Sequence, residues 1–225
     1  LMRLNKSFIV NRSATAPREK FKVAKQLSHY IQHSMHLDQA NIWIAQREGR
    51  AKDGNDKTNP AIISMLALHK EKQQPFSDYI ANTRIVPVSI SYEYDPCDKS
   101  KARELTLKAE EGKYLKGEQE DVQSIALGIT GFKGAVHLAF GEPLGAGFDT
   151  VEQVTESLDE AIINNYVLHP SNCIAYEQLT GQLPSLPVGA DKRLFNAADF
   201  AQERAYFAER LLQCEPRWRQ QYIEA

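Results

Sequence analysis

The sequence is poor in cysteine, and its three cysteines form no motif. Cys97, Cys173 and Cys214 are far apart, odd in number and in no Cys-x-x-Cys pair. This pattern excludes a disulfide framework and a cysteine zinc site, and it is typical of inert thiols in a reducing cytosol. We therefore expect a cytoplasmic protein.

The sequence also lacks a long apolar run and a strong net charge. No stretch approaches the ~18 consecutive apolar residues of a membrane-spanning helix, and no signal peptide is visible. The 225 residues carry a net charge of −2, whereas a general nucleic-acid binder is normally basic. We expect no nucleic-acid partner. With 42% hydrophobic and 25% charged residues, the composition is that of a globular protein with a real core.

Positive charge is nevertheless concentrated in the first 25 residues, where there is one carboxylate, Glu19. Such a patch could receive an anionic ligand or face anionic lipid. A solvated helix face is the other interpretation. The seven cations are Arg3, Lys6, Arg12, Arg18, Lys20, Lys22 and Lys25.

A short apolar run followed by a charged loop stands out between Asn41 and Thr58. The run Ile42–Ala45 has the length and content of a buried strand. In α/β proteins, ligands sit beyond the carboxyl ends of strands, where loops can vary. Arg47 and Arg50 flank Glu48 and Gly49, so two guanidinium groups could converge on a phosphate. Alternatively, this is a solvated loop held by its own ion pairs.

The stretch IAQREGRAKDG resembles the third sequence block of the glycerolipid acyltransferases, in which an apolar strand runs into Glu-Gly. Here the block is Glu48-Gly49-Arg50. The segment Ser7–Arg12 resembles the second block, and Val86–Ile90 resembles the fourth. The turn Gly141–Leu144, which follows the apolar run Val136–Phe140, is similar to the turn that often comes next in the family.

The resemblance and the apolar periodicity together predict the fold. We expect an α/β core over residues 1–148, with a mixed, mostly parallel sheet flanked by helices, and a helical extension over residues 149–225. Apolar residues at helical spacing predict helices at the places given next. The expected helices are Arg18–Met35, a helix opening at Asn59-Pro60, Thr150–Tyr166 and a final helix over Ala197–Tyr222. The expected later strands are Ile85–Tyr92 and Ala135–Gly141.

The family's catalytic His-x-x-x-x-Asp block is expected some tens of residues before the second block, yet only six residues precede Ser7. The chain also begins at Leu1 instead of a methionine. We therefore expect this chain to be a fragment, with the catalytic pair encoded before Leu1. A literal match, His33 to Asp38, falls between the second and third blocks at the end of a predicted helix. A pattern with two fixed positions often arises by chance, so both are interpreted as surface residues.

The resemblance implies transfer of a fatty acyl group from a coenzyme A or carrier-protein thioester to a hydroxyl of a phosphorylated glycerol, with no metal or further cofactor. It implies that Arg12, Arg47, Glu48, Gly49 and Arg50 bind the acceptor. Glu48 would accept from the glycerol hydroxyl or orient it, and Gly49 would allow close backbone approach. Pro87 and Val88 would line the acyl or thioester side. Such an enzyme would be peripheral on the inner face of the cell membrane.

Two other functions stay open. Glu48, Asp53 and Asp56 could hold a magnesium ion in a metal-dependent phosphohydrolase. The chain could instead be a non-catalytic module whose basic first helix docks on anionic lipid or an acidic carrier protein. His169 and Cys173 lie four residues apart, but no third group or oxyanion loop supports a nucleophile there.

Overall fold

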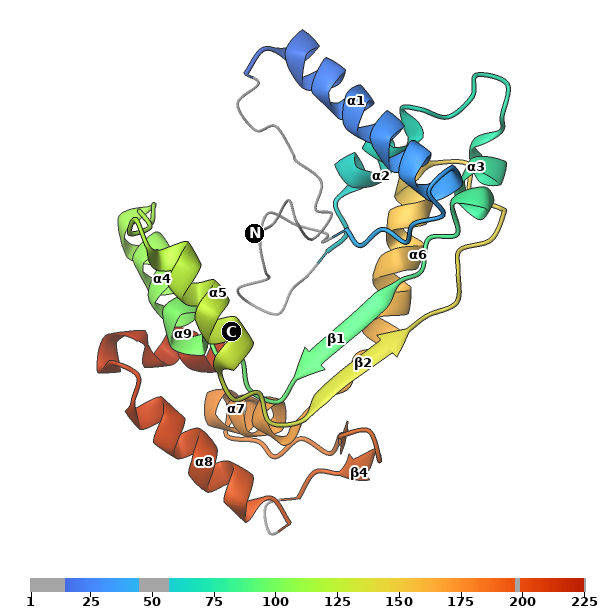
Figure 1. Ribbon diagram of the computed structural model, residues 1–225. Helices are drawn as coiled ribbons and strands as arrows, with labels where there is room; N and C mark the ends of the chain where they lie inside the picture. The colour runs from blue at the N-terminus through green and yellow to red at the C-terminus, as the bar shows by residue number, and fades with distance from the viewer. Residues whose placement is uncertain (1–14, 45–56, 197–198, 225) are drawn as a thin grey trace. The chain divides into compact units, whose positions relative to one another are not determined.

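The computed structural model describes residues 15–44, 57–196 and 199–224 (Figure 1). It divides into two compact units, each built from separated segments of the chain. The described part of the first unit comprises residues 15–44, 57–87 and 142–161, and that of the second comprises residues 88–141 and 162–224 without 197–198. The domain boundary expected at residues 148 and 149 stays a prediction.

The first unit is helical, and its helices begin where the sequence indicated. It contains α1 (Pro17–His36), α2 (Pro60–Ala67), α3 (Phe76–Thr83) and most of α6 (Val151–Asn164). Pro17 and Pro60 each occupy the first turn, where a missing N–H costs no hydrogen bond. The Asn59 side chain caps α2 by accepting a hydrogen bond from the Ala61 N–H at 3.0 Å.

A small apolar core and one shared carbonyl hold this unit together. The hydroxyl groups of Tyr79 and Ser28 both donate to the Leu66 carbonyl oxygen, at 2.6 and 2.9 Å. Since Ser28 is in α1, Leu66 in α2 and Tyr79 in α3, this acceptor links three helices. The buried core residues around them are Ile63, Tyr79, Ile80, Leu144, Val154 and Leu158.

The described part of the second unit contains two antiparallel sheets of two strands each. Strands β1 (Val88–Tyr92) and β2 (Val136–Phe140) pair in register, with Val88 opposite Phe140 and Tyr92 opposite Val136. Helices α4 (Asp98–Glu111) and α5 (Glu120–Thr130) lie between them in the sequence. The second sheet pairs β3 (Pro187–Val188) with β4 (Arg193–Leu194).

The expected fold class, with a mostly parallel sheet flanked by helices, is wrong for the residues that the structure describes, because both sheets found there are antiparallel pairs. Residues 42–44 of the expected strand Ile42–Ala45 form no strand, and Trp43 is 64% exposed. A short apolar run becomes a strand only where a neighbouring strand pairs with its backbone, which the run itself cannot specify.

The second unit ends with α7 (Pro170–Thr180), α8 (Ala201–Leu212), the 3-10 turn η2 (Pro216–Trp218) and α9 (Arg219–Glu224). The single helix expected over Ala197–Tyr222 is therefore wrong, because α8 ends at Leu212. Pro216 lacks an N–H and its ring would clash with the preceding turn, so the chain restarts there in a new direction. Among the described residues, no helix is both long and apolar enough to cross a membrane.

An ion pair with side chains only 12% and 16% exposed stands beside the apolar core of this unit. The Arg210 side chain donates to the Asp98 carboxylate and to the Asp95 carbonyl oxygen, the latter at 3.1 Å. The Tyr222 hydroxyl donates to the same Asp98 oxygen at 2.8 Å. Burial acts to lower the pKa of Arg210, but Asp98 outweighs it and raises that pKa, so the guanidinium stays charged. The core residues are Ala102, Cys173, Ile174, Val188, Phe195, Phe200, Phe207, Cys214 and Tyr222.

Candidate functional site

The predicted acceptor-binding residues are not among those that the structure describes. Arg12, Arg47, Glu48, Gly49 and Arg50 all lie outside the described residues, and their roles stay predictions. The same holds for Asp53 and Asp56 of the alternative magnesium site. Among the residues that are described, no group of three or more His, Cys, Asp or Glu side chains could hold a metal ion.

The family's catalytic pair also stays a prediction, because it was expected before Leu1. Leu1 itself lies outside the described residues, so the structure does not bear on what precedes it. The literal match inside the chain is described. His33 lies in the last turn of α1, and its Nδ1 is 3.8 Å from the Asp38 carboxylate, with side chains 48% and 58% exposed. They are surface residues and form a weak ion pair only when the histidine is charged.

Pro87 and Val88, predicted to line the acyl side, lie at the start of β1. Pro87 is buried and Val88 is half-buried. Because side chains alternate along a strand, Val88, Ile90 and Tyr92 share one face of the sheet with the residues opposite them on β2. We call this the apolar face: Val88, Ile90, Tyr92, Val136, Leu138 and Phe140.

The apolar face is exposed, which is the reverse of the usual arrangement of a half-buried strand. Leu138 is 51% exposed and Phe140 is 67% exposed. The opposite face carries Ser89 and Ser91, which are buried. Six contiguous apolar side chains in contact with solvent are the signature of a surface that receives an apolar ligand or partner.

The polar face of β1 is held by helix α7. The His169 ring nitrogen Nε2 lies 3.3 Å from the Ser91 hydroxyl oxygen, and the Ser171 hydroxyl donates to the Glu93 carbonyl oxygen at 2.6 Å. Burial lowers the pKa of His169, so the ring is neutral near pH 7. His169 and Ser91 are 2% and 1% exposed, so a substrate cannot reach them and the pair is structural.

The remaining candidate nucleophile, Cys173, lies in α7 and is also inaccessible. It is 2% exposed and belongs to the apolar core of the second unit. Burial raises the pKa of its thiol, which leaves it protonated and unreactive.

The apolar face was missed at the sequence level, although its signal is present. Over Val86–Tyr92 the apolar and polar side chains alternate, which predicts a strand with one apolar side. That pattern alone favours burial of the apolar side. The burial of Ser91 is accompanied by its contact with His169, the N-cap residue of α7, which lies 78 residues away in the sequence and could not be inferred from the strand itself.

Comparison of the chain with models of protein families, with curated proteins and with solved structures finds no match.

Proposed function

We propose that the chain belongs to an acyltransferase that moves a fatty acyl group from a thioester to the hydroxyl of a phosphorylated glycerol. The observation that carries the proposal is the sequence Glu48-Gly49-Arg50 after the apolar run at Ile42, with the related blocks before and after it in the family's order. The donor is an acyl thioester of coenzyme A or of a carrier protein.

The apolar face supports the acyl side of this proposal. A fatty acyl chain gains about 0.8 kcal/mol for each methylene group that it buries against apolar side chains. The face begins at Val88, next to Pro87, where the fourth block predicts the acyl side. It extends through Ile90 and Leu138, which are exposed and opposite each other.

Binding of the phosphorylated acceptor is assigned to two arginines. A guanidinium presents paired N–H donors that match two phosphate oxygens, so Arg50 and Arg12 suit the acceptor's phosphate. Glu48 accepts a hydrogen bond from a glycerol hydroxyl. In the reaction, the acceptor oxygen bonds to the thioester carbonyl carbon, the carbon–sulfur bond breaks, and a general base takes the hydroxyl proton.

Replacing Arg50 by alanine tests this assignment. Loss of a bidentate phosphate contact is expected to cost about 2–5 kcal/mol of acceptor binding. The apparent KM for the acceptor should therefore rise steeply in an acyl-transfer assay, with a smaller rise for Arg50→Lys. Arg193→Ala, at an exposed arginine of β4, is the matched control. An unchanged KM in Arg50→Ala would reject the role of Arg50.

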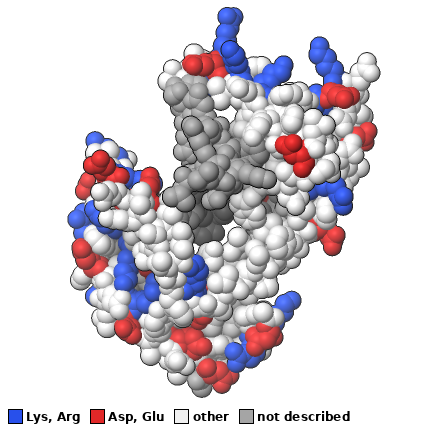
Figure 2. All heavy atoms as spheres, in the orientation of Figure 1, with Lys and Arg blue, Asp and Glu red and all other residues white. Residues whose placement is uncertain are grey.

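We further propose that the protein is cytoplasmic and meets the inner face of the cell membrane through α1. The cations Arg18, Lys20, Lys22 and Lys25 are exposed on this helix, beside Phe21, which is 57% exposed; blue side chains project from it in Figure 2. Basic residues near an anionic surface contribute about 1 kcal/mol each. Co-sedimentation with anionic vesicles should weaken steeply with salt, and should be lost in Lys20→Glu/Lys22→Glu. Binding that is insensitive to salt would contradict this contact.

A further inference from the structure

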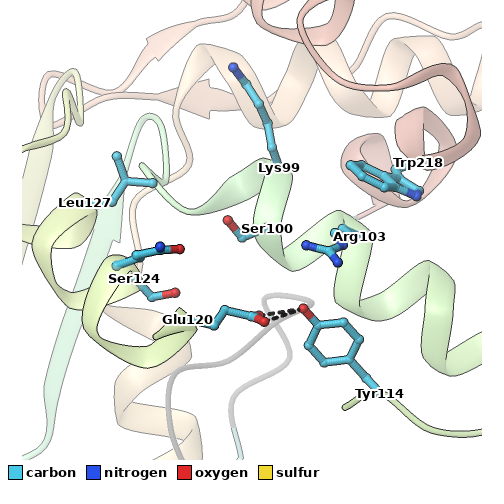
Figure 3. Close-up of a pocket in the computed structure, with 9 residues that line it drawn as sticks. Lys99, Ser100, Arg103, Tyr114, Glu120, Ser124, Leu127 and Trp218 are labelled. Carbon is cyan, nitrogen blue, oxygen red and sulfur yellow. Dashed lines mark hydrogen bonds between the residues drawn. The ribbon is translucent and has the colours of Figure 1, made fainter. Parts of the chain in front are cut away.

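The second unit contains a hollow of about 290 Å³ that the proposed reaction does not use. Figure 3 shows that Ser100 and Arg103 reach it from α4, Glu120 and Ser124 from α5, with Tyr114 and Trp218 beside Arg103. The spacing explains this convergence, because residues three or four apart on a helix share one face. Its volume is at the lower end of the range for small-molecule sites.

Arg103 is the notable side chain in this hollow. Its guanidinium carbon lies 5.8 Å from the ring centroid of Tyr114 and 5.8 Å from that of Trp218, so two aromatic rings position it. Within the described residues, neither a hydrogen-bond acceptor nor a carboxylate partner is found for it. Five N–H donors and a full positive charge are thus held in place with no counter-ion from those residues.

The nearest carboxylate in the hollow is already engaged. The Tyr114 hydroxyl donates to both oxygens of Glu120, at 2.6 and 2.7 Å, and the Gly117 N–H donates to one of them at 3.1 Å. Burial and the charge and hydrogen bond of Glu120 raise the pKa of Tyr114 to about 12, so the phenol remains a donor. The Glu120 carboxylate therefore already accepts hydrogen bonds from Tyr114 and Gly117. Its remaining lone pairs can accept a hydrogen bond from a ligand hydroxyl.

The remaining polar groups favour one kind of ligand. Lys99 also lines the hollow, but its ammonium donates to the Gln213 side chain at 2.7 Å. Arg103 supplies the charge, while Ser100 and Ser124 supply hydroxyl donors on opposite sides of the same space. A tetrahedral anion with three terminal oxygens can use donors from several directions, whereas a planar carboxylate is satisfied by one guanidinium.

We propose that this hollow is a binding site for a phosphate monoester, with the phosphate on Arg103 between the rings of Tyr114 and Trp218. The phosphate takes hydrogen bonds from Ser100 and Ser124, and a hydroxyl of the ester donates to Glu120. This site is separate in sequence from the predicted acceptor residues around Arg50, and the proposal does not depend on the acyltransferase reaction.

Trp218 lines the hollow, so its fluorescence can report ligand binding at this site. The protein has two tryptophans, so Trp43→Phe leaves Trp218 as the only one. Trp43 is 64% exposed in the first unit, and its replacement should be silent for folding. In this background, titration with glycerol 3-phosphate or inorganic phosphate should change the Trp218 emission in a saturable way. Glycerol and acetate should not.

Substitutions identify the group responsible. Arg103→Gln should weaken phosphate binding roughly tenfold or more, because it removes a charge-assisted contact. Arg217→Gln is the matched control, since Arg217 is an exposed arginine of η2 already paired with Glu110. If Arg103→Gln does not fold, Ser124→Asp introduces a repelling charge and should weaken binding comparably. Arg50→Ala should leave the Trp218 signal intact, which separates this site from the proposed acceptor site.

Two sources can supply the phosphate. A signal from soluble glycerol 3-phosphate supports a free metabolite, and a signal only from phosphatidylcholine vesicles that contain phosphatidate supports a lipid headgroup. Absence of a saturable change with any of these phosphate-bearing probes would overturn the proposal. So would an equal signal in Arg103→Gln, or equal binding of acetate and phosphate.

Discussion

Two arginines of the second unit have similar aromatic surroundings and opposite electrostatic ones. Arg210 lies 5.5 Å from the ring centroid of Tyr94 and 5.8 Å from that of Tyr206, much as Arg103 lies near Tyr114 and Trp218. Arg210 is, however, 12% exposed and donates to Asp98 and to a backbone carbonyl. Arg103 is exposed and has no such partner among the described residues.

The difference shows how the same residue type serves stability or binding. A buried charge must be paired, because an unpaired one loses its hydration without compensation. Arg210 is saturated by its neighbours beside the core. Arg103 keeps contact with water, so it can remain unpaired at little cost and exchange water for a ligand. The aromatic rings position both groups and do not distinguish them.

The largest effect is expected from breaking the Arg210 pair. Arg210→Met leaves Asp98 buried without its cation and should lower the free energy of unfolding by about 3–5 kcal/mol. Urea unfolding followed by circular dichroism measures this. In the double variant Arg210→Met/Asp98→Leu the second charge is also gone, and part of the loss should be restored. A single variant as stable as the original protein would show that the pair is not a structural element.

A smaller, pH-dependent effect is expected at His169, which is buried like Arg210 but neutral. Its pKa is lowered in the folded state by burial, so near its ordinary pKa of about 6.5 the unfolded chain binds more protons. The contribution of the neutral His169 ring to the free energy of unfolding is therefore fully present above that pH. It is lost as the pH falls through the folded-state pKa. Comparing the urea midpoints of the original protein and His169→Gln between pH 7.5 and 5 measures it. The original should lose more stability on acidification, and parallel curves would contradict this.

A still smaller change in stability is expected at Arg103. Arg103→Gln removes an exposed guanidinium held by two rings, which is worth about 0.5–1 kcal/mol. The same urea unfolding experiment measures it, with Arg217→Gln expected to change stability by only a few tenths of a kcal/mol because exposed ion pairs contribute little. If Arg103→Gln were as destabilising as Arg210→Met, Arg103 would be a core residue and the comparison would fail.

The sequence predicted local elements well, and it failed on long-range pairing. The regular apolar spacing from Phe21 to Met35 and the position of Pro17 placed α1 within about one residue at each end. Strand β1 was expected, but its partner and direction were not determined by its own residues. The mostly parallel sheet was expected from the family resemblance together with the apolar periodicity, and the described part of the run at Ile42 forms no strand.

The same distinction applies to the sites. Arg103 was not identified from the sequence, because its second aromatic partner, Trp218, lies far along the chain. Trp218 comes from a turn that follows α8, more than 100 residues later, and its approach depends on the break at Pro216. Ser100 and Arg103 of α4 line one hollow with residues of α5, which can be recognised only once the two helices are placed together. The Glu48-Gly49-Arg50 block, by contrast, is a prediction from local sequence alone, and it lies outside the described residues.

The most direct test of the proposed function is the binding of glycerol 3-phosphate, measured by calorimetry on the Arg103→Gln protein so that only the acceptor site can respond. We predict saturable binding that glycerol does not reproduce and that Arg50→Ala abolishes. Heat no greater than dilution, or equal binding in Arg50→Ala, would contradict the assignment of this chain to a phosphorylated-glycerol acyltransferase.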